Sequence, residues 1–255
     1  MDNLLHHVDL ITRQRRRGDL ALHVVAALHE LVGARSVSLY KIHPQGDTTL
    51  VGLVATADAG GVHGFDDGLG LPTGTAPIEH HPRLRDCLRQ AGAGHACSDG
   101  DAHHQVFVLG RDPALPLGMV DIESAAPIDD EVRAVADGLL ALMLNCLDML
   151  DYSETDTLTG LLNRKTFDQF LIDILTNINR QGDDGQTAAG APLPARRQAH
   201  PEASLHWLGV VDVDHFKSIN DRHGHLIGDE VLILIAQMMK SSFRLQDRLF
   251  RFGGE

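Results

Sequence analysis

The chain has 255 residues, a formal net charge of −13, 43% hydrophobic residues and 22% charged residues. This composition is typical of an ordinary globular chain and is unlike that of a disordered or fibrous protein. The negative charge argues against sequence-independent binding to a nucleic-acid backbone or to an anionic membrane, because both would repel the protein. A phosphate ligand would therefore need lysine side chains, metal ions or main-chain N–H groups placed locally.

The cysteines and the apolar runs indicate a cytoplasmic protein. Cys87, Cys97 and Cys146 are odd in number and form no C-x-x-C pair, so a disulfide framework is not expected. The N-terminus has its basic cluster after its apolar residues, and the longest apolar runs are too short to span a bilayer. We therefore expect a reducing compartment and no membrane segment.

The N-terminal part, residues 1–127, predicts an α+β domain with an antiparallel sheet. Apolar spacing indicates helices, β-rich runs indicate strands, and clustered glycine and proline indicate loops. In chain order we expect a helix over about 4–32 with a solvated interruption at "RQRRRGD", a hairpin of strands 35–42 and 48–56, a loop over 58–77, a helix over 81–92, and an antiparallel pair of strands 103–110 and 116–124.

A connecting helix is predicted for about residues 128–154. Its apolar residues repeat at spacings of 3, 4, 3, 4 and 3, which suits two helices packed side by side. These residues are Val132, Val135, Leu139, Leu142, Cys146 and Met149. One interpretation is a parallel dimer stalk, and the other is a helix packed on its own sheet.

The C-terminal part, residues 155–255, predicts alternating helices and strands. In chain order we expect an amphipathic helix up to about residue 180, an exposed insertion without chemistry at about 181–204, a buried strand over 205–214, a loop and long helix over 215–243, and a second strand over 247–252.

Two carboxylates mark the end of the predicted strand 205–214. Asp212 and Asp214 are two residues apart and would share one face of the strand, where they repel each other unless a hard cation such as Mg²⁺ lies between them. The alternative is a pair of solvated aspartates. Downstream, Lys217 suits a phosphate, and Asn220 and Asp229 suit the edge of a nucleobase. No P-loop motif is present.

Three separated motifs resemble the GGDEF domains of bacterial diguanylate cyclases. They are "DTLTGLLNRKTF" (156–167), "DVDHFKSINDRHGHLIGDEVL" (212–232) and "RLQDRLFRFGGE" (244–255). The N-terminal part resembles a GAF-type sensory domain in its element order and in the run "PLGMVDIESAAPIDDEVRAVADGLL". The resemblance implies a GAF-like sheet domain, a helical stalk and the first part of an α/β GGDEF domain.

The resemblance also implies an activity and a set of site residues. Two GTP molecules are joined into cyclic di-GMP with release of two pyrophosphates, using Mg²⁺ or Mn²⁺, and two domains must face each other. A homodimer through the sensory domain and stalk is therefore expected. The implied residues are Asp212, the Val213 carbonyl and Glu255 for metal; Phe216 and Lys217 for the triphosphate; Asn220 and Asp229 for guanine; and Gly253 and Gly254 for the turn beside the nucleotide. Asp212, Glu255 and Lys217 are the implied catalytic set.

A regulatory site is implied by Arg244 and Asp247, which form R-x-x-D ahead of the paired glycines. In the family this motif binds cyclic di-GMP, which inhibits the enzyme. The alternative is a surface i,i+3 ion pair of little energy. The pairs His6–His7, His80–His81 and His103–His104 are interpreted as solvated or packed histidines, because adjacent side chains do not converge on a metal.

The chain stops inside the implied signature, at Glu255. The 255-residue polypeptide is therefore expected to be inactive by itself, whereas the full-length protein would be a cyclase regulated by its N-terminal domain, which would receive an unknown small-molecule or protein signal. The alternative is a non-catalytic dimerisation module whose GGDEF part is a degenerate receptor for GTP or cyclic di-GMP. The residue after Glu255 would discriminate between them, since Glu-Phe supports catalysis.

Overall fold

The structure is a computed structural model that describes residues 2–46, 48–65, 72, 74–90, 95–112, 115–183, 207–244 and 247–253. It divides into two compact units. The N-terminal unit comprises Met1–Ser153 with Arg244–Arg248, and the C-terminal unit comprises Glu154–Phe243 with Leu249–Glu255. Within the described residues, none of the helices combines the length and the apolar character needed to cross a membrane.

The N-terminal unit is built on a seven-stranded antiparallel sheet. The main strand order is β3-β2-β1-β7-β6-β5, and β4 pairs with β2. The strands are β1 (Ser36–Gln45), β2 (Thr48–Asp58), β3 (Gly61–Gly64), β4 (Ala76–Pro77), β5 (His95–Asp99), β6 (Ala102–Leu109) and β7 (Gly118–Ser124). The predicted pairs β1–β2 and β6–β7 are both antiparallel, which confirms the α+β fold class for this part.

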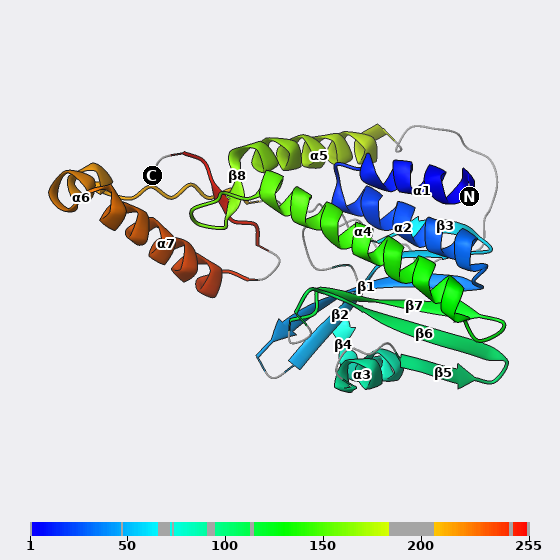
Figure 1. Cartoon of the computed structure of the whole chain (residues 1–255). Helices are drawn as coiled ribbons and strands as arrows, with labels where there is room; N and C mark the ends of the chain where they lie inside the picture. The colour runs from blue at the N-terminus through cyan, green and yellow to red at the C-terminus, as the bar shows by residue number, and fades with distance from the viewer. Residues whose placement is uncertain are drawn as a thin grey trace. The chain divides into compact units, whose positions relative to one another are not determined.

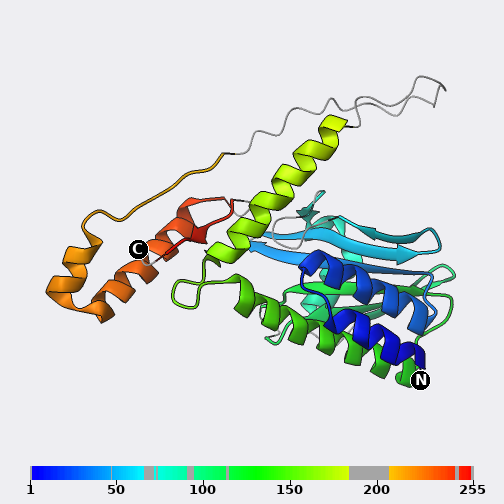
Figure 2. The ribbon, with the colours of Figure 1, turned by 90° about the horizontal axis from the view of Figure 1, so that it is seen from above.

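Helices cover both faces of this sheet (Figure 1). On one face lie α1 (Asp2–Thr12), α2 (Arg17–Val32) and α4 (Asp130–Glu154), which Figure 2 shows side by side over the strands. On the other lie α3 (Pro82–Arg89) and the 3-10 turn η1 (Ile78–His80). Each face buries its own apolar cluster, one around Val25, Val120 and Ile122 and a smaller one around Val106 and Met119.

Three details of the N-terminal unit differ from the sequence prediction. The loop expected over 58–77 contains the short strands β3 and β4, which pair with β2. Strand β5 was not foreseen. Its five residues "HACSD" have no alternating apolar pattern, and its pairing with β6 defines it. Glycine-rich segments can join a sheet edge when a neighbouring strand supplies the hydrogen-bonding partners, and a local pattern does not contain that information.

Helix α4 packs on its own domain through a stripe that coincides in part with the predicted seam. Its buried residues are Ala136, Leu139, Leu140, Met143 and Leu150. Of the six predicted seam residues only Leu139 is buried, and Met149 has 69% of its surface exposed. The interpretation as a helix packed on its own sheet therefore accounts for the buried stripe, and a dimer stalk stays a prediction.

The C-terminal unit contains five elements among its described residues. They are β8 (Leu162–Asn163), α5 (Arg164–Asp183), α6 (Phe216–His223), α7 (His225–Ser242) and β9 (Phe250–Arg251). The amphipathic helix, the long helix and the second strand are thus found where the sequence predicts them. Helix α5 extends three residues into the insertion expected at 181–204, and most of that insertion lies outside the described residues.

The buried strand predicted over 205–214 is wrong for the residues that the structure describes. Residues 207–213 have no strand pairing, and Trp207, Val210 and Val211 are 92%, 89% and 68% exposed. An apolar run becomes a buried strand only when neighbouring strands satisfy its N–H and C=O groups and side chains cover its faces. Among the described residues no strand pairs with residues 207–213, so this apolar segment does not form part of a sheet.

Candidate functional site

The hairpin of α6 and α7 positions Asn220, one of the two implied guanine-reading residues. Gly224, with φ 85°, ends α6, and α7 begins at the next residue. A Cβ at Gly228 would lie 1.8 Å from Asn220 Oδ1 and 3.3 Å from Phe216 Cζ, so only glycine fits there. Phe216 is 6% exposed and fixes the start of α6 beneath this contact.

The amide of Asn220 has an unsatisfied acceptor. Its Oδ1 is buried and has no hydrogen-bond partner among the described residues. A buried acceptor without a donor costs free energy, on the order of 1–3 kcal/mol, and such atoms gather where a ligand supplies the missing partner. Asn220 is therefore the member of the implied set whose own geometry indicates a ligand.

Asp212 and Val213 lie directly before α6. The Phe216 N–H donates to the Val213 carbonyl at 3.3 Å, and His215 between them adopts φ 57°. Asp212 is exposed and Val213 is half-buried. A carboxylate and a carbonyl are oxygen donors of the kind that Mg²⁺ prefers. Within the described residues, no three His, Cys, Asp or Glu side chains come together as a metal site.

The other residues that the resemblance implies are exposed or lie outside the described residues. Lys217 and Asp229 are exposed on α6 and α7, and Gly253 is exposed after β9. Gly254 and Glu255 lie outside the described residues. The structure thus joins Phe216, Asn220 and Gly228 in one packed hairpin, with Lys217 and Asp229 on the same two helices.

A parallel pair of strands holds the first part of the signature. Leu162 pairs with Phe250 and Asn163 with Arg251, so "FR" (250–251), directly before the paired glycines, lies beside "LN" of the motif at 156–167. Asn163 Oδ1 accepts from the Thr166 N–H at 3.0 Å at the start of α5. Separated segments that resemble the family therefore meet in space.

An ion pair ties the same two motifs together. Arg251 Nη1 donates to Asp156 Oδ1 at 2.8 Å, and the Thr159 N–H and hydroxyl donate to the same oxygen at 2.9 and 2.7 Å. Although burial raises the pKa of Asp156, the hydrogen bonds from Arg251 and Thr159 outweigh it and lower that pKa. The sequence identified the motif at 156–167 but did not predict Arg251 as the partner of Asp156, because the two residues are 95 positions apart.

Aromatic side chains strengthen this contact. The ring of Phe167 on α5 lies 5.2 Å from that of Phe250 and 4.7 Å from that of Phe252, both edge to face. The Arg164 guanidinium lies 5.5 Å from the Phe252 ring centroid. Such pairs contribute on the order of 0.5–1.5 kcal/mol each beyond burial. The start of α5 thus fixes the strand that leads into Gly253.

The R-x-x-D segment is a local turn. The Asp247 carboxylate accepts from the main-chain N–H of Arg244 at 2.9 Å, and the Asp247 N–H donates to the Arg244 carbonyl at 2.9 Å. The carboxylate is thereby oriented by the main chain. The role of the two residues in product binding stays a prediction.

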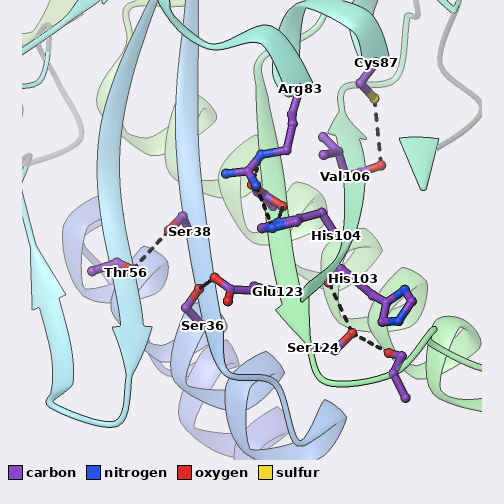
Figure 3. Close-up of polar contacts among 12 residues, drawn as sticks. Ser36, Ser38, Thr56, Arg83, Cys87, His103, His104, Val106, Glu123 and Ser124 are labelled. Atoms are coloured by element: carbon purple, nitrogen blue, oxygen red, sulfur yellow. Dashed lines mark hydrogen bonds and ion pairs between the residues drawn. The ribbon is translucent and has the colours of Figure 1, made fainter. Parts of the chain in front are cut away.

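The N-terminal unit has a polar area on the sheet face that carries α3 (Figure 3). Ser36 donates to Glu123 Oε2 at 3.1 Å, and Thr56 donates to the Val37 carbonyl at 3.0 Å. Because the Thr56 hydroxyl proton is used, Ser38 must donate in the 3.1 Å Ser38–Thr56 bond. The hydroxyl protons are thus engaged within the protein, and this area offers acceptors outward.

An ionic cluster in which His104 and Asp121 are buried and Arg83 is exposed borders this area, and the sequence did not predict it. Arg83 reaches from α3 and donates from Nη1 to His104 Nε2 at 2.5 Å, while His104 Nδ1 lies 3.1 Å from Asp121 Oδ1. Arginine has no acceptor, so Nε2 accepts and Nδ1 carries the proton that is donated to Asp121. His104 is 5% exposed, which agrees with the interpretation of this histidine as packed.

Comparison with known proteins supports the reading of the C-terminal motifs. Residues 194–255 match the family described as "Diguanylate cyclase, GGDEF domain". The C-terminal part of the chain is thus similar in sequence to GGDEF domains. Diguanylate cyclase DgcP of Pseudomonas aeruginosa is 38% identical over 154 residues, which cover 60% of this chain and 18% of that protein.

Two further relatives are also diguanylate cyclases. Diguanylate cyclase DgcZ of Escherichia coli is 31% identical over 159 residues, covering 60% of this chain and 44% of that protein. Diguanylate cyclase A of Treponema denticola is 32% identical over 117 residues, covering 46% and 27%. The chain thus spans less than half of the length of each of these three relatives.

Solved structures of sensory domains are also similar to this chain. The GAF domain of an Acinetobacter phosphoenolpyruvate-protein phosphotransferase has a TM-score of 0.43 at 10% identity, covering 61% of this chain and 96% of that one. The chromophore-binding domain of bacteriophytochrome RpBphP3 from R. palustris has a TM-score of 0.46 at 11% identity, covering 60% and 62%.

Proposed function

We propose that the protein is a diguanylate cyclase whose N-terminal unit regulates a C-terminal GGDEF domain. The observation that carries the proposal is the Asn220 amide, which belongs to a GGDEF sequence and whose Oδ1 is buried without a partner among the described residues. The N–H groups on the edge of guanine are donors that fit this acceptor, and Asp229 on α7 supplies a second acceptor. Adenine offers a different pattern, so the site selects GTP.

The proposed reaction joins two GTP molecules held by two copies of the chain. Each 3′-hydroxyl attacks the α-phosphate of the other GTP, a P–O bond forms, the bond to pyrophosphate breaks, and the hydroxyl proton leaves. Lys217 and the Phe216 N–H hold the triphosphate, and Gly253 and Gly254 leave space beside the main chain. Positioning provides most of the acceleration in such transfers.

Asp212, the Val213 carbonyl and Glu255 are the proposed ligands for Mg²⁺ or Mn²⁺. Carboxylate and carbonyl oxygens fit these cations in chemical type. When bound, the metal neutralises phosphate charge and favours ionisation of the attacking hydroxyl. The protein's own contribution is to place Asp212 and Val213 immediately before the helix that carries Lys217 and Asn220.

Three further assignments belong to the same proposal. The chain acts as a cytoplasmic homodimer, since one domain holds only one GTP. Cyclic di-GMP binds at Arg244 and Asp247 as an inhibitor. The signal acts on the N-terminal unit, and the outward acceptors of Ser36, Ser38 and Glu123 favour a small molecule with N–H donors.

The test is an assay of the polypeptide as its gene encodes it, from start codon to stop codon. Incubation with GTP and Mg²⁺ is expected to yield cyclic di-GMP and pyrophosphate, whereas ATP yields no cyclic dinucleotide. GTP binding without product would favour the receptor alternative. Absence of both GTP binding and product would overturn the proposal.

A pair of glycine variants tests the base-reading role of Asn220. Gly228→Ala introduces a methyl group where Asn220 Oδ1 now lies, whereas Gly138→Ala in α4 meets no atom within 4 Å. Displacing one hydrogen-bonding amide is expected to weaken GTP binding about tenfold in Gly228→Ala. Gly138→Ala should bind GTP as the unaltered protein does. Equal GTP affinity in both variants would show that Asn220 does not contribute to GTP binding.

A further inference from the structure

The last turns of helix α4 carry charges that oppose their position in the helix. Asp148, Asp151 and Glu154 lie near its C-terminal end, and no basic residue occupies the last turn. The carbonyl end of a helix has a partial negative charge, so acidic side chains there are unfavourable. The N-terminal end of α4 is capped by its own sequence, because Asp129 Oδ1 accepts a hydrogen bond from the Val132 N–H at 2.8 Å. Cations from other elements must therefore stabilise the C-terminal end.

Arg111 is the first of these cations. It follows β6 and donates from Nε to Asp148 Oδ2 at 2.9 Å and from Nη2 to Asn145 Oδ1 at 2.9 Å. The main chain that presents it is tightly packed, since a Cβ at Gly110 would lie 3.1 Å from Pro116 Cα. A shift of strand β6 would consequently move Arg111 along the end of α4.

Arg17 is the second cation. It is the first residue of α2, its side chain is 18% exposed, and it forms an ion pair with Asp151. A cation at a helix N-terminus is unfavourable for its own helix, as Asp151 is for α4. The ion pair places Arg17 at the negative end of α4 and Asp151 at the positive end of α2. Each misplaced charge is therefore favourable for the neighbouring helix.

We propose that Arg17 and Arg111 form an arginine clamp that keeps residues 145–154 helical and attached to the N-terminal unit, and that opening the clamp is how this unit changes cyclase output. The regulatory part rests on the proposed function. The clamp residues hold the end of the helix that leads out of the N-terminal unit. Ion pairs with at least one exposed partner, as both of these are, are individually weak, so a small rearrangement of β6 or α2 is sufficient to open the clamp.

The first test measures amide hydrogen exchange of residues 145–154 in the full-length protein. The double variant Arg17→Gln/Arg111→Gln is expected to exchange about three- to tenfold faster there, with unchanged protection of β1 and β7. Arg13→Gln is the matched control, because Arg13, directly after α1, forms an exposed ion pair with Asp9 at 2.9 Å. Unchanged exchange in the double variant would overturn the clamp.

A second variant separates the clamp from a general loss of helix stability. Adding Asp148→Asn and Asp151→Asn to the double variant removes the acids that oppose the helix dipole, so slow exchange is expected to return. Raising the salt concentration should accelerate exchange in the unaltered protein and have little effect in the double variant. Failure of the asparagine variants to slow the exchange would contradict the electrostatic origin of the clamp.

The regulatory part is tested by the rate of cyclic di-GMP formation. The double variant is expected to differ from Arg13→Gln by about threefold or more at unchanged KM for GTP, as a changed connection alters catalysis and leaves the nucleotide site intact. Faster exchange with an unchanged rate would overturn the regulatory part. An unaltered protein that makes no cyclic di-GMP would contradict the proposed function, while the exchange result would still decide the clamp.

Discussion

Two segments of the chain have nearly the same sequence pattern and different structures. Gly118-Met119-Val120-Asp121-Ile122 forms the first five residues of strand β7, whereas Gly209-Val210-Val211-Asp212-Val213 has no strand pairing and is mostly exposed. Strand β7 lies between β1 and β6, which satisfy its main chain on both sides. The comparison teaches that an apolar run with one aspartate becomes a buried strand through its neighbours.

Substituting the two aspartates, Asp121 and Asp212, is expected to give the largest difference in stability between these segments. Asp121 is 8% exposed and accepts from His104, with Arg83 Nε 3.6 Å from its other oxygen. Asp121→Asn is expected to lower the free energy of unfolding by about 2–3 kcal/mol, because it removes the charged acceptor from the buried hydrogen bond with His104. Urea denaturation followed by circular dichroism measures this. Asp212→Asn should leave stability within about 0.5 kcal/mol and should abolish cyclic di-GMP formation.

The neighbouring valines give a matched pair with a somewhat smaller effect. Val120 is fully buried and Val211 is 68% exposed. Val120→Ala is expected to cost about 2 kcal/mol through lost burial and the cavity left behind, and Val211→Ala less than about 0.5 kcal/mol. The same denaturation measurement applies. A cost for Val211→Ala equal to that for Val120→Ala would indicate that residues 207–213 form the buried strand that their pattern predicts.

In the C-terminal unit, the Asp156–Arg251 ion pair links two segments that are distant in the sequence. Asp156→Ala removes three hydrogen bonds to one carboxylate oxygen and is expected to cost about 1.5 kcal/mol. Arg251→Gln should cost less, since the bonds from Thr159 remain. Hydrogen exchange of the Leu162 and Phe250 amides reports on the strand pair. Equal protection in all three proteins would show that the ion pair does not hold β8 to β9.

The stability of the N-terminal unit is expected to depend on pH through His43. Burial, with a contribution from nearby Lys41, lowers the pKa of His43 to about 4. The unfolded chain takes up this proton near pH 6.5, so between pH 6.5 and about 4 the unfolded state binds more protons and stability falls as pH falls. We expect about 1 kcal/mol, a discounted value because His43 is only half-buried. His43→Gln should remove this part of the pH dependence of the free energy of unfolding.

The smallest expected effect is a gain in stability. Gly138 lies inside α4, and a Cβ there meets nothing within 4 Å. Gly138→Ala should stabilise the N-terminal unit by about 0.5–1 kcal/mol, because alanine has the higher helix propensity. Thermal unfolding measures this gain. A loss of stability would mean that another chain packs closely on α4 in solution, as the predicted dimer stalk requires.

The sequence predicted most helices and the hairpins of the N-terminal unit, because periodicity and turn residues are local properties. It also identified the C-terminal motifs and placed Asn220 among the site residues. It missed β5 and the Arg83–His104–Asp121 cluster, whose partners come from separate elements. Of the candidate site, the pairing of "LN" (162–163) with "FR" (250–251) and the partner of Asp156 depended on contacts across more than 80 residues.

By itself the sequence determined the order of most elements, the resemblance of the C-terminal part to GGDEF domains and the residue types available for metal, phosphate and base. Tertiary structure alone decided which apolar runs became strands, which stripe of α4 is buried and which charges meet. The physical reason is that local patterns fix what each segment can do, while hydrogen-bond partners, burial and counter-charges come from residues distant along the chain. The arginine clamp is one such case, since Arg17 and Asp151 are ordinary surface residues until α2 and α4 bring them together.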